Sequence, residues 1–442
     1  MYVVFGEFLG LDYSLVPSCK PGYGLQLGSQ QLELPDMFLS NAQENWLGSA
    51  TLPVMPIACW DIAQTLLRAP LVDQPLPVLF GKPEIEISDQ FVRIGVDILG
   101  TVFFMLSRYE EVVFSARDEH DRFPAAASIA RRAGFLDRPI VDEYVEVLWA
   151  AMKRLWPALE RKQRQSRTLV SCDVDHPYVR SSNSVTGVIK RLGGDLMKRH
   201  SLSMAARSLS IGMRTLQGDF SSDPYFTALD WIMDVNEKAG NRVAFYFITA
   251  HSHATLDGFY CMNEPLIRGL LRRIAARGHE IGLHASYNSY QDADQTCREA
   301  VVLREIMAEE DIHQEGIGGR QHFLRWDTAK TARNWEVAEM SYDSTLSYAD
   351  YPGFRCGTCC EYPMYDLIER RPLHLRQRPL VLMECSVIAD RYMGMGYSDK
   401  TLELMMQYKK TCQKFNGDFT LLWHNSHFLN AEDRSFYQKL IR

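Results

Sequence analysis

Short apolar runs alternate with longer stretches of helical periodicity from residue 168 onward. A short apolar run between polar residues is typical of a buried strand, and apolar residues at i, i+3, i+4 and i+7 are typical of a helix. Strands joined by helices predict a parallel sheet with the helices outside it, as an open sheet or a barrel. The expected strands are 168–174, 243–248, 280–283, 316–320, 380–387 and 419–424, and the expected helices are 224–239, 263–277, 293–310, 328–340 and 398–415.

The chain before residue 160 has a different pattern. Strands are expected at 76–81 and 90–96, a first strand at 1–7, and helices at 97–113 and 141–159. The polar run 161–167 marks a boundary. Because 442 residues are too many for one ordinary core, two domains are expected. The predicted fold class is α/β, with a separate N-terminal α/β domain (1–162) and a C-terminal β/α domain (168–442).

Composition narrows the class of protein. The chain is 46% hydrophobic and 23% charged, which is typical of a globular protein, and its net charge of -7 argues against a nucleic-acid binder. No apolar run reaches the length of about 20 residues that a membrane span needs. The first residues lack the features of a signal peptide, and ten scattered cysteines suit a reducing compartment. These observations predict a cytoplasmic protein.

Two further features have alternative interpretations. The cluster Cys356-Gly357-Thr358-Cys359-Cys360 lacks the second pair of a structural zinc site, and a redox role would need a thioredoxin-like context that the pattern does not show. At the end of the 97–113 helix, Arg108 lies beside Glu110 and Glu111. This group is either a functional site or a solvated, ion-paired helix end, and the second interpretation is the more common one.

The segment 180–215 is basic. Its apolar residues Val185, Ile189, Leu192 and Leu196 form a stripe at helical spacing. A basic amphipathic helix either lies on an anionic membrane or binds an acidic substrate, and otherwise it packs on the domain with its charges in water. The basic residues are Arg180, Lys190, Arg191, Lys198, Arg199, Arg207 and Arg214, against the one acid Asp195.

The strongest candidate chemistry lies in Ser171-Cys172-Asp173-Val174-Asp175-His176-Pro177. Residues i and i+2 of a strand point to the same face, so Asp173 and Asp175 are expected to project together. Two like charges this close need a cation, or one of them must take up a proton. The alternative is a turn in which an aspartate caps the following loop. Other polar residues follow expected strands, where parallel sheets build their sites: His284, Arg320, His322 and His424.

Several of these stretches resemble motifs of the polysaccharide deacetylases, the NodB-homology or carbohydrate esterase family 4 enzymes. Gly278-His279-Glu280-Ile281-Gly282, followed by His284, is similar to the second motif of that family, and Asp173 with Asp175 is similar to the first. The resemblance covers about 168–442. It implies a distorted β/α barrel that removes an N- or O-acetyl group from a sugar with the help of a divalent metal.

The resemblance assigns roles by position. Asp173 would be the general base, and Asp175 and His284 would be metal ligands. Arg320 would orient Asp173 through charge-assisted hydrogen bonds. His424, in the run Leu421-Leu422-Trp423-His424-Asn425 that is similar to the last motif, would be the general acid.

One position departs from the family pattern. The second histidine ligand of the family falls on Asn288, whose amide oxygen is a weaker partner for zinc than imidazole. Either Asn288 still binds the metal, or another histidine such as His176 or His322 replaces it, or the metal is lost. The expected ligands are therefore Asp175, His284 and Asn288, and the expected cofactor is zinc, with manganese, cobalt or nickel as alternatives.

Further residues are candidates for substrate binding. His322, Arg325 and Trp326 could line a sugar subsite, although a tryptophan is as often part of a core. Asp343 stands where family members often place an orienting acid, and Arg355 is a possible substrate contact.

The N-terminal part also carries a resemblance. The runs 76–81 and 104–111 are similar to an uncharacterised domain that precedes the deacetylase-like domain in a bacterial subgroup associated with surface-polysaccharide synthesis. The expected substrate is therefore an acetylated sugar on a lipid- or nucleotide-linked glycan precursor, and the protein is expected to touch a membrane at most peripherally. The alternatives are a non-catalytic carbohydrate-binding domain of the same fold, and an amidohydrolase or deformylase acting on a small molecule.

Overall fold

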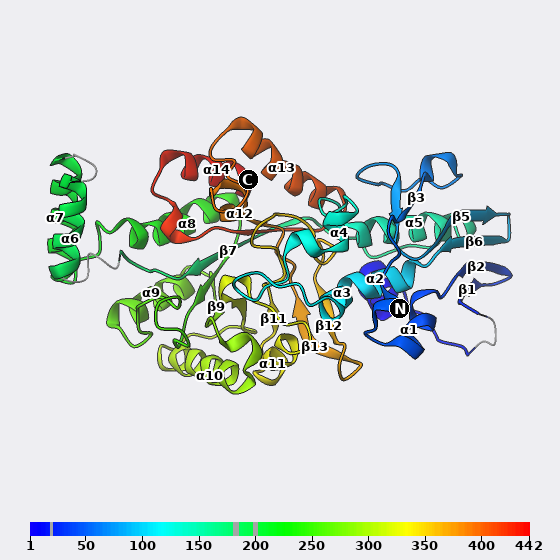
Figure 1. Cartoon of the computed structure of the whole chain (residues 1–442), viewed down its shortest axis with the longest axis horizontal. Coiled ribbons are helices and arrows are strands. Elements are labelled where there is room, and N and C mark those ends of the chain that lie inside the picture. The colour runs from blue at the N-terminus through cyan, green and yellow to red at the C-terminus, as the bar shows by residue number, and fades with distance from the viewer. Residues whose placement is uncertain (18–20, 180–184, 198–201) are drawn as a thin grey trace.

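The computed structural model describes residues 1–17, 21–179, 185–197 and 202–442. The molecule is elongated, with the N-terminal part at one end and a larger sheet with its helices at the other (Figure 1). None of the helices in these ranges combines the length and the apolar character that crossing a membrane requires.

The larger sheet has nine strands in the order β12-β13-β11-β10-β9-β8-β7-β15-β14. All neighbours run parallel except the antiparallel pair β12 and β13. The sheet curls into a half-barrel whose edges within the described chain are β12 and β14. The strands are β7 (Arg167–Val174), β8 (Val243–Phe247), β9 (Glu280–Ala285), β10 (Gly318–Gln321), β11 (Tyr342–Asp343), β12 (Tyr362–Asp366), β13 (Arg371–Gln377), β14 (Leu382–Met383) and β15 (Asp418–Leu422).

Helices cover the convex side of this sheet, as the alternating pattern predicts (Figure 1). The first of them, α8, shows why they form where they do: the Asp223 side chain accepts from the backbone N–H groups of Tyr225 and Phe226, and Gly240 ends the helix in the left-handed conformation. The covering helices are α8 (Pro224–Ala239), α9 (Pro265–Ala276), α10 (Ala293–Glu309), α11 (Thr331–Val337), α13 (Asp399–Lys414) and α14 (Ala431–Ile441), and the short α12 (Glu384–Ile388) directly follows β14.

The concave side of the sheet is polar toward the carboxyl ends of the strands. Glycines make room there for two tyrosine rings: a Cβ on Gly282 would lie 2.6 Å from the Tyr246 ring, and one on Gly318 would lie 2.1 Å from the Tyr342 ring. The side chains of Cys172 and Val174 belong to the main core, whereas Asp173, between them in β7, faces the concave side. The period of two along β7 therefore holds as the sequence predicts.

The N-terminal part contains a four-stranded sheet in the order β1-β2-β6-β5, a two-stranded ribbon of β3 and β4, and several helices. The strands are β1 (Tyr23–Leu27), β2 (Gln30–Leu34), β3 (Ala58–Trp60), β4 (Leu76–Val78), β5 (Gly81–Ile87) and β6 (Phe91–Val96), and the helices are α1 (Phe38–Asn45), α2 (Ile98–Leu106), α3 (Tyr109–Val113), α4 (Ile129–Arg132) and α5 (Ile140–Leu155).

Three sequence predictions about elements are wrong. The first residues form a π-helix, η1 (Val3–Leu9), instead of a strand. The expected strand 380–387 is only the short β14, after which the chain turns into α12. Both errors arise because a short apolar run does not by itself distinguish strand from helix. The expected helix 97–113 divides into α2 and α3 at Arg108, whose φ is 55°.

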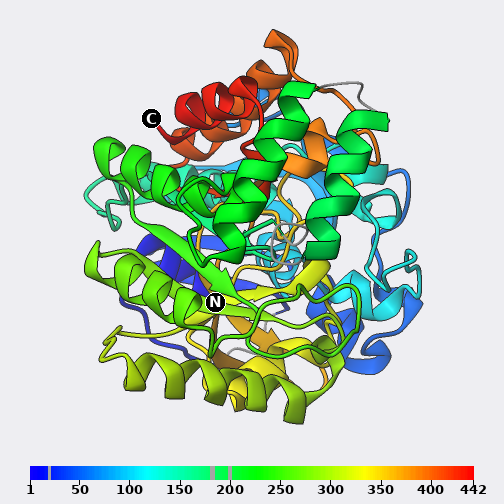
Figure 2. The same ribbon diagram turned by 90° about the vertical axis from the view of Figure 1, so that its left-hand side faces the viewer.

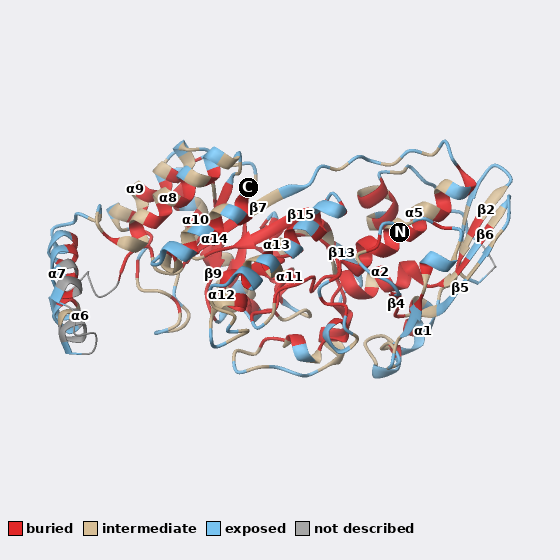
Figure 3. Ribbon diagram, turned by 90° about the horizontal axis from the view of Figure 1, so that it is seen from above, coloured by how far each residue is buried: buried red, intermediate tan, exposed pale blue. Residues whose placement is uncertain are grey.

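The two parts of the chain share one hydrophobic core, so a separate N-terminal domain is not confirmed. Burial is continuous from α2 and α5 into the β/α part (Figure 3). Charged side chains also join the two parts. Both Glu111 oxygens accept hydrogen bonds from Arg355 of the β/α part. Arg108 donates to Glu110, to Glu111 and to the hydroxyl of Tyr348 in the β/α part.

The more common interpretation of this charged group from the sequence was a solvated, ion-paired helix end. The structure shows instead that the group is buried. Arg108 and Glu110 are each 1% exposed and Glu111 is 2% exposed. Buried charges persist only when they are paired and hydrogen-bonded, which explains why so many donors converge on these carboxylates.

The basic segment forms two helices, α6 (Val185–Met197) and α7 (Leu202–Leu216), that pack against each other and project from the end of the molecule opposite the N-terminal part (Figures 1 and 2). Val188, Ala205 and Ile211 are buried. Arg180, Lys198 and Arg199 lie outside the described residues, as do the side chains of Arg191, Asp195, Leu196 and Arg207. The exposed apolar side chains on the pair are Val185, Ile189, Met197, Leu202, Leu209, Met213 and Leu216.

Glu111→Gln tests whether the buried charges hold the two parts together. The substitution leaves Arg108 and Arg355 buried with less negative charge, and breaking such a group costs about 3–5 kcal/mol of unfolding free energy. Urea unfolding measures it. The matched control is Glu86→Gln, whose ion pair with Arg93 is exposed and should cost about 0.5 kcal/mol or less. Equal stability of the two variants would contradict this account.

Candidate functional site

Three side chains converge where β7, β9 and β10 end. The Asp175 Oδ1 lies 3.1 Å from His284 Nε2 and 3.6 Å from His322 Nε2. One donor atom from each of the three lies within 4.8 Å of the others, and the two imidazole rings are 4.8 Å apart between centroids. We call Asp175, His284 and His322 the first cluster.

Neighbouring groups fix the orientation of both imidazoles. The His284 Nδ1 lies 2.9 Å from the backbone oxygen of Arg320, so this nitrogen carries the hydrogen and donates it. The His322 Nδ1 lies 3.0 Å from a carboxylate oxygen of Asp257 and donates to it. In both rings the Nε2 atom is therefore the one that faces Asp175. Carboxylate and carbonyl partners of this kind are what metal-binding histidines have in proteins.

The loop after β10 turns His322 toward the cluster. The next two residues, Phe323 and Leu324, have φ values of 60° and 56°, a conformation that costs energy for residues with a Cβ. Asp257 holds the loop in place from the other side. Burial would raise the pKa of Asp257, but the hydrogen bonds from His322, Tyr287 and His253 outweigh it and hold the pKa at about 2. The carboxylate that receives the His322 hydrogen is therefore ionised.

The Asp173 carboxylate lies beside the first cluster. Its Oδ1 accepts from Arg320 Nη1 at 2.6 Å, and its Oδ2 lies 3.6 Å from His284 Nε2. Arg320 is fully buried and also donates to Ser171 and to two oxygens of Ser344. Its guanidinium is thus fixed on all sides, and it leaves one oxygen of Asp173 turned toward the cluster.

A second cluster adjoins the first on the side of β14 and β15. His424 and His427 direct Nδ1 atoms to the same Glu384 oxygen, at 2.6 and 2.9 Å, and Cys385 Sγ lies 3.2 Å from His427 Nδ1. The other nitrogen of His424, Nε2, lies 3.8 Å from Asp175 Oδ2 and so links the two clusters. We call Glu384, Cys385, His424 and His427 the second cluster.

Glu384 controls the charge of both histidines. Burial lowers the pKa of His424, but the negative charge of Glu384 outweighs it and raises that pKa well above its ordinary value. In the same way, hydrogen bonds that His427 donates to Cys385 and Glu384 outweigh burial and raise the pKa of His427 to about 10. Burial raises the pKa of Cys385, and hydrogen bonds from the two histidines outweigh it and lower that pKa overall.

Asn288 does not lie among the three donor atoms of the first cluster, although the sequence made it the expected third ligand. Its side-chain amide donates to the backbone oxygen of Ser252 and its Oδ1 accepts from Arg325, at 2.9 and 3.2 Å. Its amide oxygen is therefore occupied, and His322, which the sequence offered as one alternative, stands in the cluster instead.

Two expected substrate contacts have structural surroundings. The Arg325 guanidinium lies between the rings of Tyr287 and Tyr290, 4.1 and 3.9 Å from their centroids, and donates to the backbone oxygens of His120 and Tyr287. Trp326 is 2% exposed and belongs to the core. A ring buried in this way has no free face for a sugar, so core packing, the alternative interpretation of Trp326, is what the structure shows.

Asp343 and Arg355 are buried as well. Both Asp343 oxygens accept from Thr345, and burial raises the pKa of Asp343 to about 6. Asp343 thus braces the loop whose residue Ser344 holds Arg320. Arg355 is bound to Glu111 at the junction with the N-terminal part, so its guanidinium is committed to a structural ion pair.

Sequence reasoning missed four residues of the two clusters and their support: Asp257, Glu384, Cys385 and His427. Asp257 lies in a loop without periodicity, which gives no signal. Glu384 lies inside the expected strand 380–387, and a lone acid in a strand pattern does not indicate a site. The spacing of His427 three residues after His424 was the one signal that could have been used.

The first cluster fits a divalent cation. In tetrahedral coordination with bonds of about 2.0–2.1 Å, ligand atoms lie about 3.3 Å from one another. The spacings of 3.1 and 3.6 Å around Asp175 Oδ1 are close to this value. That oxygen is buried and accepts no hydrogen bond in the described structure. A carboxylate and two imidazoles are also ligands that zinc and related metals prefer.

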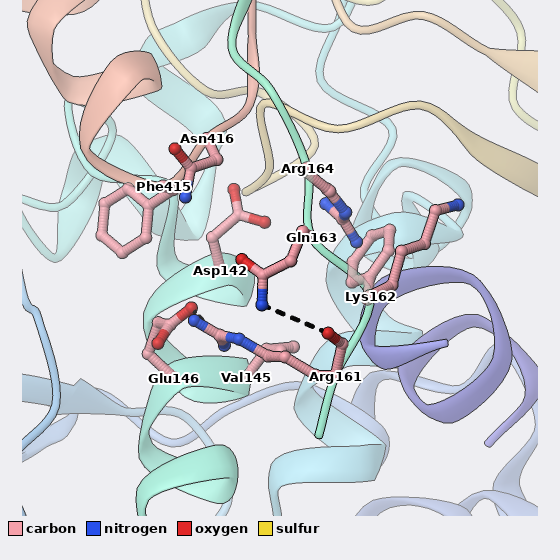
Figure 4. Close-up of a pocket in the computed structure, with 10 residues that line it drawn as sticks. Asp142, Val145, Glu146, Arg161, Lys162, Gln163, Arg164, Phe415 and Asn416 are labelled. Atoms are coloured by element: carbon pink, nitrogen blue, oxygen red, sulfur yellow. Dashed lines mark hydrogen bonds and ion pairs between the residues drawn. The ribbon is translucent and has the colours of Figure 1, made fainter. Parts of the chain in front are cut away.

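A hollow elsewhere on the molecule is too small to be a sugar site. It lies between α5, the segment 161–164 and the end of α13, and it has a volume of about 40 Å³, which holds only a few water molecules (Figure 4). Beside it, Cys359 Sγ lies 3.3 Å from the buried Asp142, and Cys360 contacts Arg164. These cysteines therefore belong to the packing of α5 against the β/α part.

Glu384→Gln tests the electrostatics of the second cluster. Removing the negative charge should lower the pKa of His424 and His427 by about one unit or more. In the native protein the pKa values of these histidines are raised on folding. Their contribution to the free energy of unfolding is therefore present in full below about pH 6.5 and is lost as the pH rises through about 10. NMR titration of histidines in metal-free protein measures the pKa values. Glu237→Gln, at another glutamate that contacts an imidazole, is the control; unchanged values in Glu384→Gln would contradict the assignment.

Comparisons with known proteins cover the two parts unequally. Residues 1–157 match a family described as a family of unknown function, DUF7033. No curated protein matches the chain. Among solved structures, the chain is similar to the "putative polysaccharide deacetylase from Mycobacterium smegmatis", with 13% identity and a TM-score of 0.40 over 63% of this chain and 84% of that one. A similarity this distant assigns neither a family nor an activity to the chain, and the family match does not reach either cluster.

Proposed function

We propose that the protein is a metal-dependent hydrolase that removes an acetyl group from a sugar. The observation that carries the proposal is the first cluster, an acid and two histidines with orphaned Asp175 Oδ1 between them, next to an aspartate fixed by a buried arginine. The order of the motifs along the chain, which resembles that of the polysaccharide deacetylases, supports the same chemistry.

Asp175, His284 and His322 would hold the metal. A bound divalent cation polarises an amide or ester carbonyl and lowers the pKa of water. The chain supplies what the ligands need: the Arg320 carbonyl and the Asp257 carboxylate take the Nδ1 hydrogens, so that both Nε2 lone pairs are free to bind.

Asp173 would accept the proton of the attacking water. Its Oδ1 is committed to Arg320, and its Oδ2 faces the cluster 3.6 Å from His284 Nε2. A carboxylate held by one oxygen keeps the other at a fixed place, which is what proton transfer requires. Arg320 would act through Asp173, by holding its orientation.

His424 would donate a proton to the departing group. Glu384 holds its Nδ1 and keeps the ring protonated, so Nε2 carries a hydrogen on the side of the first cluster. The His424 side chain is 15% exposed and that of Asp175 is 22% exposed, so both are within reach of a substrate from solvent. The pair has the geometry of a general acid with an orienting carboxylate.

An N-acetylated sugar on a lipid- or nucleotide-linked precursor is the proposal that the sequence favours, and a small formylated or cyclic amide remains the alternative. The complete set of donor atoms in the first cluster favours an enzyme over a carbohydrate-binding domain without catalysis.

Asp173→Asn and His322→Ala separate the two roles. Asp173→Asn should keep the metal and lower kcat for acetate release from chitooligosaccharides by about 10²–10⁴-fold, the contribution of a general base. His322→Ala should weaken metal binding at least tenfold. Replacing even a residue that only hydrogen-bonds to a metal ligand typically lowers metal affinity 10–100-fold, and His322 would be a ligand itself. Metal analysis after dialysis and an acetate assay are the measurements.

Asn288→Ala is the matched control, since its side chain is exposed and bound to Arg325. Metal content should be retained in this variant. Loss of metal in Asn288→Ala with retention in His322→Ala would contradict the ligand set, and acetate release by Asp173→Asn at the native rate would contradict the role of the base.

We also propose that the α6–α7 pair touches an anionic membrane. The exposed apolar side chains on a pair of helices that projects from the molecule and has a basic sequence support this. Full-length protein should co-sediment with phosphatidylglycerol vesicles and dissociate at high salt, and Ile189→Glu should weaken binding. Ile368→Glu changes an exposed isoleucine on another part of the surface and should bind normally. The absence of binding to anionic vesicles would contradict the proposal.

A further inference from the structure

The second cluster has more ligand atoms than a proton-donating pair needs. Glu384 with His424 is sufficient to orient and charge one imidazole, yet Cys385 and His427 are directed to the same point. One donor atom from each of the four residues lies within 4.8 Å of the others. A thiol, two imidazoles and a carboxylate in one place are a complete set of four zinc-type ligands.

The hydrogen bonding of Glu384 is uneven. Its Oε1 accepts from the backbone N–H of His424 and faces the Nδ1 atoms of both histidines, whereas its Oε2 is buried and has no hydrogen-bond partner in the described structure. A buried carboxylate oxygen without a partner is costly. A cation bound at the cluster would offset that cost and the crowding of donors around the other oxygen.

The position of the cluster allows an ion to enter. Glu384 and Cys385 are buried, but the His427 side chain is 43% exposed and lies at the surface of the cluster. The cluster comes from two paired parallel strands: Glu384 and Cys385 follow β14 directly, and His424 and His427 lie in the turn after β15.

We propose that Glu384, Cys385, His424 and His427 form a second metal site, selective for zinc-type cations by virtue of its thiolate. Binding releases the thiol proton of Cys385 and any imidazole proton on the Nδ1 atoms to solvent. The site differs from the first cluster in having sulfur among its ligands.

His424 couples the two sites. Its Nδ1 belongs to the second cluster, and its Nε2 lies 3.8 Å from Asp175 Oδ2. An ion bound to Nδ1 would displace the hydrogen bond between that nitrogen and Glu384, which orients the ring. This one consequence rests on the proposed function: metal added beyond the one equivalent that fills the first site should lower the rate of hydrolysis.

Cobalt(II) alone, added to the full-length protein, tests the site without any activity assay. A thiolate ligand gives a sulfur-to-cobalt charge-transfer absorption in the near ultraviolet, which a carboxylate and imidazole site cannot give. The absorption is expected in the native protein and in His322→Asn, in which the first cluster is disabled. The absorption should be absent from Cys385→Ser. In His427→Gln the cobalt affinity measured from it should fall at least tenfold. Adding zinc to the native protein should remove it.

The outcomes are distinct. Three results would overturn the proposal. They are an absorption that survives in Cys385→Ser, an absorption that is lost in Cys359→Ser because the metal lies beside Asp142, and no absorption in the native protein. Metal bound by Cys385→Ser at one equivalent per chain reports the first cluster separately. Failure of the second site therefore leaves the proposed hydrolase standing, and failure of the first leaves the cobalt result unchanged.

Discussion

The ion pair of Arg320 with Asp173 is the contact on which the rest of the site depends. Both side chains are buried, and the guanidinium lies 2.6 Å from the carboxylate. Their strands, β10 and β7, are separated by β9 and β8. Neighbouring strands lie about 4.8 Å apart, so a flat sheet would hold these strands roughly 14 Å apart with parallel side chains. The pair can form only because the sheet curls, and neither charge could be buried without the other.

The same curl assembles the first cluster. In register, Arg320 is opposite His284, so the histidine that neighbours the ion pair is brought over the end of β7. Asp175 follows Asp173 by two residues and points to the same side. Gly282 and Gly318 give the Tyr246 and Tyr342 rings room under these groups, and a side chain at either position would push the strands apart. The chemistry at the edge of the sheet and the shape of the sheet are therefore consequences of one arrangement.

The charges at this edge are predominantly negative. Arg320 pairs with Asp173, and the charged His424 and His427 pair with Glu384, whereas Asp175 and Asp257 face imidazoles. Imidazoles separate the remaining carboxylates, with Nδ1 hydrogens directed to Asp257 and Glu384. A cation between Asp175 and the two facing Nε2 atoms would complete the balance of charge, which is the physical reason for regarding the first cluster as a metal site.

The sequence predicted the parts of this arrangement that depend on periodicity. The alternation after residue 168 gave the parallel strands and most helices, and the i, i+2 spacing placed Asp173 and Asp175 on one face. The sequence pattern could not predict the geometry of the loops. Two residues with positive φ follow His322 and turn that histidine toward the cluster. Asn288 is held elsewhere by the hydrogen bond that its Oδ1 accepts from Arg325. The short strands β11 to β13 were missed, and the burial of Trp326 and Arg355 depends on packing between distant segments that a local pattern does not contain.

An anomalous diffraction map from crystals of the zinc-loaded protein, recorded at the zinc edge, tests the central claim most directly. The account predicts a peak within coordination distance of Asp175 Oδ1 and the Nε2 atoms of His284 and His322, with Arg320 still bound to Asp173. A zinc peak at Asn288, or the first cluster without zinc while His284 is turned away from Asp175, would contradict it.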